Sequence, residues 1–345
     1  MTVVDLHTHV VPQTLISALS ADSARFRVPG ELKNGIRTVE HDGRPHWDTN
    51  GRLKEIEREL YDTDAKVAEM DRMGVDVSAL SVAPPTYFYD LGVEDGVHAS
   101  RLSNDGIAAM VQEYPERLRG LATLPMQDPS AAIEELDRMV DVPGFVGVEM
   151  GASIEGRTLE DMRFRPVLKA ITERGWFVLT HPNKCVATGG MEGFDLFNAI
   201  GFPLDEVIMA SRLMLSGAMD DVPDLRIVIP HGGGYLPYQI GRLECVHRNR
   251  PVARTGTATS PRELFGRFYF DALTHDPVAL RMLIDLVGAD HVVIGSDHPF
   301  DMGYADPVSE LDKVPGLTAH EREMITNGTA MSLMGEAAVR VAVDR

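Results

Sequence analysis

The chain has 345 residues, a length that fits two or three domains of average size or one large α/β barrel. Hydrophobic residues make up 44% and charged residues 25%, the balance of a soluble globular protein, which excludes the disordered and fibrous classes. With 33 basic and 52 acidic residues the net charge is -19, and a surface this negative repels phosphate backbones and anionic lipids, so we expect neither nucleic acid nor membrane as a partner.

The first residues, MTVVDLHTHV, lack the basic start and apolar run of a signal peptide, and no apolar stretch of about 18 residues follows elsewhere. We therefore expect a cytoplasmic protein. The two cysteines, Cys185 and Cys245, are far apart and lack CxxC spacing. This spacing argues against a disulfide framework and against a thiolate metal site.

Short apolar runs alternate with amphipathic segments along nearly the whole chain. Strands are predicted at 3–7, 77–82, 118–124, 145–150, 176–181, 226–231, 267–273 and 291–297. Helices are predicted between them at 64–73, 99–116, 130–139, 159–174, 204–219 and 277–286. Eight nearly continuous apolar strands that alternate with helices predict a closed parallel (β/α)₈ TIM barrel of the α/β class, a single domain over residues 1–345.

Two regions interrupt this alternation. Residues ~20–60 form an insertion after strand 1, and their alternating pattern around Asp42 and Gly43 predicts a β-hairpin. We expect this insertion to lie as a lid over the barrel mouth. Residues 181–203 follow the fifth strand and are rich in Gly and Asn, which is typical of a loop that contacts substrate.

Five polar residues stand at the carboxyl ends of predicted strands: His7, His9, His181, His231 and Asp297. These ends meet at one mouth of a barrel, and the two-residue spacing in His-x-His places both rings on one side of the strand. Imidazoles and a carboxylate suit Zn²⁺ or a similar divalent ion, so a mononuclear metal site is predicted. Any one of these histidines alone is more often a hydrogen-bonded core or loop residue, and Asp297 alone could cap the segment after it. Without a metal site, however, such an ordinary structural role would have to apply independently to all five residues.

The same residues carry a family resemblance. DLHTHVVP, GLATLPMQDP, THP, PHGGGYLPYQIGR, FYFDALTHDP and GSDHPF resemble the signature segments of the amidohydrolase superfamily, in the branch that includes 2-amino-3-carboxymuconate-6-semialdehyde decarboxylase. The resemblance covers roughly residues 1–335. It implies that His7, His9, His181 and Asp297 bind a divalent metal, usually zinc with manganese as the alternative, and that His231 is a catalytic histidine beside it.

Many members of this branch remove a carboxylate without oxidation from an aromatic or unsaturated acid. The resemblance therefore implies a small-molecule carboxylic acid as substrate, with His231 and Asp297 as the candidate proton donor and acceptor. Arg242 matches an arginine that reaches the substrate of a neighbouring subunit in the family, so a homodimer is expected. Arg58, Trp47 and Phe88 are further predicted substrate contacts. The sequence departs from the family pattern in a longer insertion, which sets Trp47 opposite a substrate-binding arginine.

Three glycines, Gly232 to Gly234, follow the sixth strand, and we interpret them as a tight turn that orients His231. Other functions stay open on this scaffold. A metal-dependent hydrolase or hydratase would act on a lactone, an amide or an unsaturated acid, with Asp297 as base. A phosphoesterase of the barrel class would need two or three metals, and a binding barrel would need none.

Overall fold

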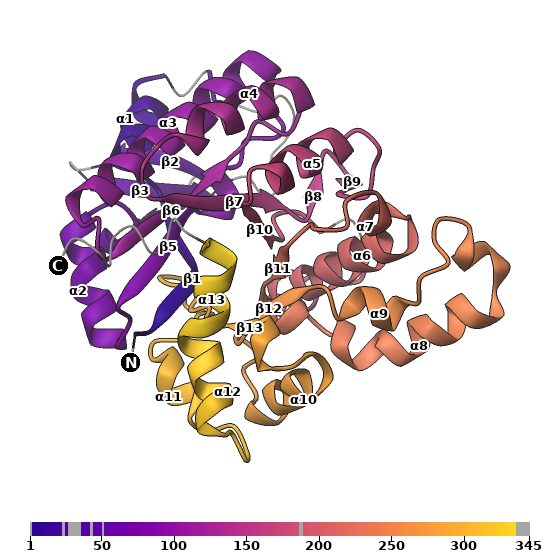
Figure 1. Ribbon diagram of the computed structural model, residues 1–345. Helices are drawn as coiled ribbons and strands as arrows, with labels where there is room; N and C mark the ends of the chain where they lie inside the picture. Colours follow the sequence, from indigo (N-terminus) through magenta and orange to yellow (C-terminus); the bar gives the residue numbers. More distant parts are fainter. Residues whose placement is uncertain are drawn as a thin grey trace.

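The computed structural model describes residues 2–22, 25–26, 36–41, 44–49, 52–185 and 189–335. Eight strands form one sheet in which every neighbouring pair is parallel, in the order β1 (Val4–Val10), β5 (Val77–Val82), β6 (Leu118–Thr123), β7 (Phe145–Gly151), β10 (Phe177–His181), β11 (Ile227–Ile229), β12 (Tyr269–Asp271) and β13 (Val292–Val293). The amide of Leu6 donates to the carbonyl of Ile294 at 3.0 Å, which joins the first strand to the end of the last and closes the barrel (Figure 1). The predicted TIM barrel is confirmed.

Helices surround the sheet on its outer side (Figure 1). The α-helices are α1 (Gln13–Ala21), α2 (Thr63–Met73), α3 (Val93–Glu113), α4 (Pro129–Val140), α5 (Arg165–Glu173), α6 (Phe202–Leu215), α7 (Ala218–Asp221), α8 (Leu236–Asn249), α9 (Pro261–Phe265), α10 (Pro277–Val287), α11 (Pro307–Leu311), α12 (Ala319–Glu323) and α13 (Thr329–Met334). Shorter 3₁₀ and π segments are η1 (Arg58–Leu60), η2 (Pro84–Thr86), η3 (Phe197–Gly201), η4 (His231–Gly233), η5 (Pro251–Arg254), η6 (Ala289–His291) and η7 (Met324–Gly328).

The core has two layers. Side chains of the strands that point inward fill the barrel, among them Leu121, Phe177 and Leu179. A larger cluster lies between the strands and the helices, as the apolar runs covered on both faces require. Asp62, Asp128 and Asp276 cap the first turns of α2, α4 and α10 through their side chains. No helix within the described residues is long and apolar enough to cross a membrane.

Three predicted helices have clearly different bounds in the structure. The helix predicted over 99–116 is α3, which begins at Val93 and ends at Glu113. The helix predicted over 204–219 is split, because Gly217 has a φ of 83° and ends the run between α6 and α7. The helix predicted over 159–174 begins only at Arg165, since β8 (Ser153–Ile154) pairs with β9 (Arg157–Thr158) just before it. Hydrophobic periodicity did not indicate these boundaries.

The insertion after strand 1 contains the predicted hairpin. Strands β2 (Ile36–His41) and β3 (Arg44–Thr49) pair antiparallel, and β4 (Arg52–Glu55) adds a third strand. The turn residues Asp42 and Gly43 lie outside the described residues. The chain then returns to the barrel, where the carbonyl of Leu60 accepts from the amide of Val11 at 2.7 Å. The insertion thus rejoins the fold at the carboxyl end of β1, while its function as a lid stays a prediction.

Candidate metal centre at the carboxyl ends of the strands

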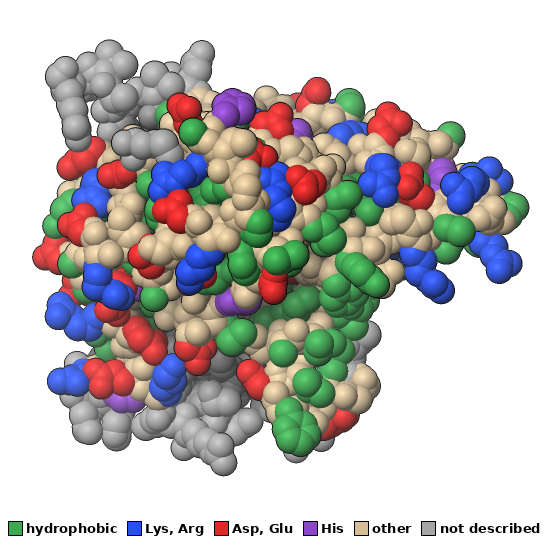
Figure 2. Space-filling view, turned by 90° about the horizontal axis from the view of Figure 1, so that it is seen from below, with side chains coloured by type: hydrophobic (Ala, Val, Ile, Leu, Met, Phe, Trp, Pro, Cys, Tyr) green, Lys and Arg blue, Asp and Glu red, His purple; other side chains and the backbone are tan. Residues whose placement is uncertain are grey.

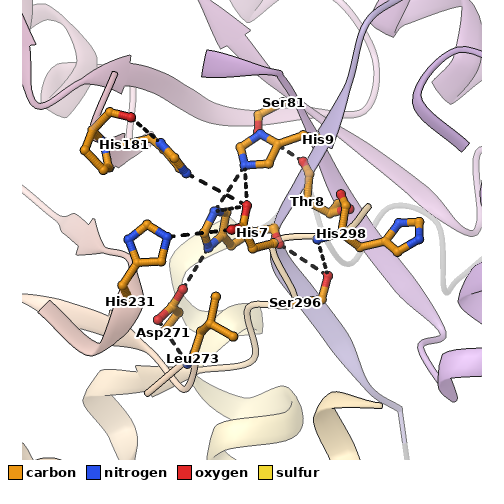
Figure 3. Close-up of polar contacts among 12 residues, drawn as sticks. His7, Thr8, His9, Ser81, His181, His231, Asp271, Leu273, Ser296 and His298 are labelled. Atoms are coloured by element: carbon orange, nitrogen blue, oxygen red, sulfur yellow. Dashed lines mark hydrogen bonds and ion pairs between the residues drawn. The ribbon is translucent and has the colours of Figure 1, made fainter. Parts of the chain in front are cut away.

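The structure brings together all five residues predicted from the strand ends. His7 and His9 lie in β1, His181 ends β10, His231 begins η4 after β11, and Asp297 follows β13. Asp297 is at the centre: its Oδ1 atom lies 3.3 Å from Nε2 of His7, 3.0 Å from Nε2 of His9 and 3.9 Å from Nε2 of His181. The other oxygen, Oδ2, lies 3.7 Å from Nε2 of His231. Figure 3 shows the rings of His7, His9, His181 and His231 directed toward one point.

Strand geometry explains how β1 supplies two of these rings. Successive side chains of a strand point to opposite faces, so His7 and His9 share one face and their Nε2 atoms are 3.2 Å apart. Thr8 points the other way, and its hydroxyl donates to the carbonyl of His298 at 2.9 Å. The amide of Asp297 donates to the carbonyl of His7 at 2.8 Å. Main-chain contacts between the first and last strands therefore set the position of Asp297.

His231 and Asp297 both have left-handed backbone conformations, with φ values of 51° and 55°. Such conformations cost non-glycine residues about 1–3 kcal/mol and persist where surrounding contacts impose them. For Asp297 those contacts include the preceding residue, because the hydroxyl of Ser296 donates to the carboxylate of Asp5 at 2.6 Å. The two residues for which the sequence predicts proton transfer are thus among the non-glycine residues with this strained conformation.

Each of the four imidazoles has an oxygen acceptor at its outer nitrogen. The distances from Nδ1 are 2.8 Å to Asp271 Oδ2 for His7, 3.3 Å to the Val82 carbonyl for His9, 2.7 Å to the Pro182 carbonyl for His181, and 2.5 Å to Glu206 Oε1 for His231. Because a neutral imidazole carries one hydrogen, donation from Nδ1 leaves a lone pair on Nε2. With all four rings neutral, the inner nitrogens are acceptors that face a carboxylate, which is itself an acceptor.

This arrangement fits a divalent cation. Ligand atoms of His7, His181, His231 and Asp297 all lie within 4.8 Å of one another. Nε2 of His181 and Oδ1 of Asp297 are buried and have no hydrogen-bond partner, and the Nε2 atoms of His7 and His9 are only 3.2 Å apart. Acceptors buried this closely together are unfavourable unless a positive charge, either a proton or a cation, lies between them. The chain thus contains a metal-binding site whose outer contacts orient the ligands.

Burial and charge set the protonation of this cluster. Burial lowers the pKa of His9 to about 4 and that of His181 to about 3, so both are neutral at pH 7. Burial also acts to lower the pKa of His7, but Asp297 and Asp271 outweigh it and raise the pKa to about 10. The proton of His7 neutralises Asp297 in the metal-free protein. A bound cation would replace that proton, so metal binding is coupled to proton release.

Three residues of the site were not predicted from the sequence. Asp271 ends β12, and its carboxylate accepts from both His7 Nδ1 and the amide of Gly232. The strand-end rule that found Asp297 also applies to Asp271. Glu206 lies on α6 and has no such signal. Lys66 lies on the buried face of α2 with Val67, Met70 and Met73, and a charged residue on an apolar helix face is a signal that could have been used.

Lys66 is almost completely buried, with 1% of its surface exposed, and its ammonium group contacts the backbone of His9 and His298. Its Nζ atom donates to the hydroxyl of Thr8 at 2.5 Å, to the carbonyl of His9 at 3.3 Å and to the carbonyl of His298 at 3.4 Å. These three acceptors belong to the two segments that hold His9 and Asp297. Lys66 therefore fixes the two segments against each other.

The predicted substrate contacts lie outside this cluster. Arg58 is exposed and forms an ion pair with Asp62. Phe88 packs against Phe26, with their ring centroids 5.9 Å apart. Arg242 is exposed on α8 and makes no hydrogen bond or ion pair with the described residues. Trp47 belongs to β3, but its side chain lies outside the described part of the chain. All four stay predictions.

The three glycines after β11 form the tight turn predicted from the sequence. Gly232, Gly233 and Gly234 have φ values of 61°, 74° and 60°, a region that favours glycine. A Cβ atom on Gly234 would lie 2.6 Å from the carbonyl oxygen of Pro203, next to the start of α6. The missing side chain thus allows the turn that carries His231 to pack against α6.

Comparison with known proteins agrees with this geometry. The chain is 28% identical over 340 residues to 2-amino-3-carboxymuconate-6-semialdehyde decarboxylase from Dictyostelium discoideum, with 96% of this chain and 91% of that protein covered. It is 30% identical over 310 residues to gamma-resorcylate decarboxylase from Rhodococcus jostii, with 84% and 86% covered. The crystal structure of 5-carboxyvanillate decarboxylase LigW from Sphingomonas paucimobilis matches with a TM-score of 0.79 and 25% identity, over 96% of this chain and 98% of that one.

The model of the amidohydrolase family matches residues 4–335, which include all eight barrel strands and all five residues of the cluster. The resemblance noted in the sequence segments is thereby confirmed over nearly the whole chain. The chain belongs to the amidohydrolase family.

Proposed function

We propose that the protein is a metal-dependent enzyme that removes a carboxylate, without oxidation, from an aromatic or unsaturated carboxylic acid. Three relatives at 25–30% identity are named as decarboxylases, and each match covers more than four fifths of both chains. The buried cluster of imidazoles and carboxylate supports metal dependence. The net charge of -19 does not attract an anionic substrate, so local positive charge at the site has to hold it.

The distances from the two oxygens of Asp297 support the roles that we assign to the individual residues. Oδ1 lies within 3.9 Å of the inner nitrogens of His7, His9 and His181, and we assign these four residues as metal ligands. Oδ2 faces His231 instead, at 3.7 Å. The side chain of His231 is 18% exposed, whereas those of His7 and His9 are completely buried. His231 therefore faces the barrel mouth, as a group that exchanges a proton with substrate should.

The reaction replaces a carboxylate by hydrogen. A bound divalent ion would supply positive charge that holds the anionic substrate beside the proton donor. His231 and Asp297 are the two groups placed to hold and deliver that proton, from Nε2 and Oδ2. Once the carbon is protonated, the bond to the carboxyl carbon breaks, its electron pair stays with the ring or chain carbon, and CO₂ leaves.

We propose Zn²⁺ as the ion, because imidazole nitrogens with one carboxylate are typical zinc ligands, and Mn²⁺ as the alternative. Elemental analysis of the purified protein and reconstitution of the metal-free protein with each ion distinguish them. One ion per chain is expected. A ratio of three per chain would contradict the mononuclear site and support a phosphoesterase.

A panel of carboxylated phenols, pyridines, muconates and lactones tests the function. The metal-loaded protein should release CO₂ from at least one acid and form the product with hydrogen in place of the carboxylate. Product analysis by mass spectrometry separates this outcome from ring opening or water addition. Ring opening or water addition without CO₂ would establish the hydrolase or hydratase alternative and refute decarboxylation.

Single substitutions test the residue assignment. His181→Ala and Asp297→Ala should lose bound metal and activity while the barrel stays folded, because residues at the mouth contribute more to function than to stability. His231→Ala should retain metal and lose most turnover. His320→Ala is the matched control, since His320 is exposed on α12 outside the cluster. Full activity in the His181 or Asp297 variant would refute the assigned site.

We further infer a homodimer in which Arg242 reaches the partner's substrate. Helix α8 and segment η5 form an arm that projects from the barrel (Figure 1), and Lys and Arg side chains gather at the arm's end (Figure 2). Residues 236–254 contain four arginines and one glutamate, in a chain of net charge -19. Tyr238 and Val252 on this arm are each 77% exposed. A basic arm with exposed apolar side chains complements the acidic body of a second copy.

Mixed variants test this inference. Arg242→Ala and His231→Ala are each expected to be inactive alone, and hybrid dimers should recover part of the activity because one intact site can form. Sedimentation establishes the dimer, and differently tagged chains establish mixing. If proven hybrid dimers recover no activity, Arg242 does not act on the partner's substrate. Trp47, Arg58 and Phe88 as substrate contacts, and the cytoplasmic location, stay predictions.

A further inference from the structure

Helix α6 contributes a buried carboxylate to the site, although it carries none of the residues predicted for it. Oε1 of Glu206 lies 2.5 Å from Nδ1 of His231, and the glutamate side chain is completely buried. This is the one acceptor that the described residues place at Nδ1 of His231. We propose that Glu206 is a positioning residue that holds His231 with the hydrogen on Nδ1 and with Nε2 directed at Asp297. The inference rests on the proposed role of His231 in proton transfer.

The contact depends on close packing of two segments. His231 begins the glycine turn, and Gly234 at the end of that turn approaches the backbone of Pro203 more closely than a Cβ atom would allow. Glu206 lies one helical turn after Pro203 on α6. The turn and the helix therefore meet at the point where the carboxylate and the imidazole form their contact.

The geometry of Glu206 also indicates a role for its charge. Its second oxygen, Oε2, is buried and has no hydrogen-bond partner, so the side chain is not part of a structural network that satisfies both oxygens. A buried carboxylate beside an imidazole favours the hydrogen on the nitrogen it faces and stabilises the imidazolium that forms when the other nitrogen takes a proton. In His231 that other nitrogen is Nε2, 3.7 Å from Oδ2 of Asp297.

The same helix provides a matched control. Asp205 is the neighbouring residue on α6, is also completely buried, and has an oxygen 3.5 Å from the hydroxyl of Ser153. Asp205→Asn removes the same charge from the same helical turn without removing the acceptor at His231. Glu206→Leu removes that acceptor. Glu206→Gln keeps a carbonyl acceptor but loses the charge, and it replaces Glu206→Leu if the leucine variant does not fold.

The first readout is the hydrogen position on His231, measured by nitrogen NMR of the zinc-loaded, ¹⁵N-histidine-labelled protein. The His231 signal is identified among the twelve histidines by its loss in His231→Asn. We expect the Nδ1–H form in the wild-type protein and in Asp205→Asn, and a change toward Nε2–H in Glu206→Leu and, to a smaller extent, in Glu206→Gln. An unchanged His231 signal in the folded Glu206 variants would overturn the inference.

The second readout is kinetic, on an acid that the wild-type protein decarboxylates. The Glu206→Leu variant should lose roughly 10- to 100-fold in kcat, with KM and zinc content within about twofold of the wild type. An intermediate loss is expected for Glu206→Gln. A fall in zinc content that accounts for the loss, or an equal loss in Asp205→Asn, would overturn the inference. If the wild-type protein decarboxylates none of the acids, the proposed function fails, while the NMR readout still decides the role of Glu206.

Discussion

Substitution of Gly234 by alanine tests how the His231 turn packs against α6. Gly234 has a φ of 60° and a ψ of -129°, a conformation that residues with a side chain rarely adopt. An alanine Cβ would lie 2.6 Å from the Pro203 carbonyl oxygen, whereas ordinary contact begins at 3.4 Å. The turn must therefore move by 3.4 − 2.6, or about 0.8 Å, because the obstructing atom belongs to the backbone.

Two costs follow from this displacement. Backbone strain of about 1–3 kcal/mol and overpacking of a similar size together lower the free energy of unfolding by about 2–6 kcal/mol. The amide of Gly234 donates to the carbonyl of His231 at 3.0 Å, so the shift also moves His231 away from Glu206. Misplacement of a reacting group by about 1 Å can cost about 100-fold in rate, so we expect a 10- to 100-fold lower kcat.

Differential scanning calorimetry and CO₂ release measure these effects. Gly266→Ala is the control, since Gly266 has a φ of -65° and the closest atom to its added Cβ is 3.6 Å away. This control should stay within about 0.5 kcal/mol of the wild type in stability and should keep its kcat. Wild-type stability and turnover in Gly234→Ala would refute the packing argument.

Three other perturbations follow from the same structure. Lys66→Met should weaken metal binding by roughly 10- to 100-fold in chelator competition, because it removes the donor that fixes the carbonyls of His9 and His298. The Lys66→Arg variant should retain part of the affinity. Equal metal affinities in the wild type and both variants would contradict this role of Lys66. Glu321→Gln should cost about 1 kcal/mol at pH 7, measured by chemical denaturation, because Glu321 accepts from Arg281 and from the amide of Thr318. Arg281 and that amide lower the pKa of Glu321 from 4.5 to about 2. The stabilising effect of Glu321 is therefore complete above pH 4.5 and disappears as the pH falls toward 2. A difference in unfolding free energy between variant and wild type that stays constant over that range would refute the reasoning. Chelation of the metal should abolish turnover, and one equivalent of the ion per chain should restore it; activity that survives complete metal removal would refute metal dependence.

The barrel and five residues of its site could be predicted from the sequence because the relevant signals are local. Apolar runs bounded by turns mark strands, and the position of a polar residue at a strand's end is visible within a few residues. In a closed parallel barrel all such ends meet at one mouth, so His7, His181 and Asp297 could be grouped although they are far apart in the chain. Asp271 ends β12 and obeys the same rule, so its place beside His7 was also within reach of the sequence.

The tertiary structure decided the contacts that no local pattern encodes. Glu206 and Asp205 are adjacent acidic residues on α6, yet Glu206 alone contacts His231, because the rotation of the helix and the close approach at Gly234 select it. Packing also decides which carboxylate oxygen of Asp297 meets which ring: Oδ1 lies near three imidazoles, and Oδ2 faces His231. Periodicity in the sequence determines which face of an element is buried, whereas packing between elements determines which atoms meet.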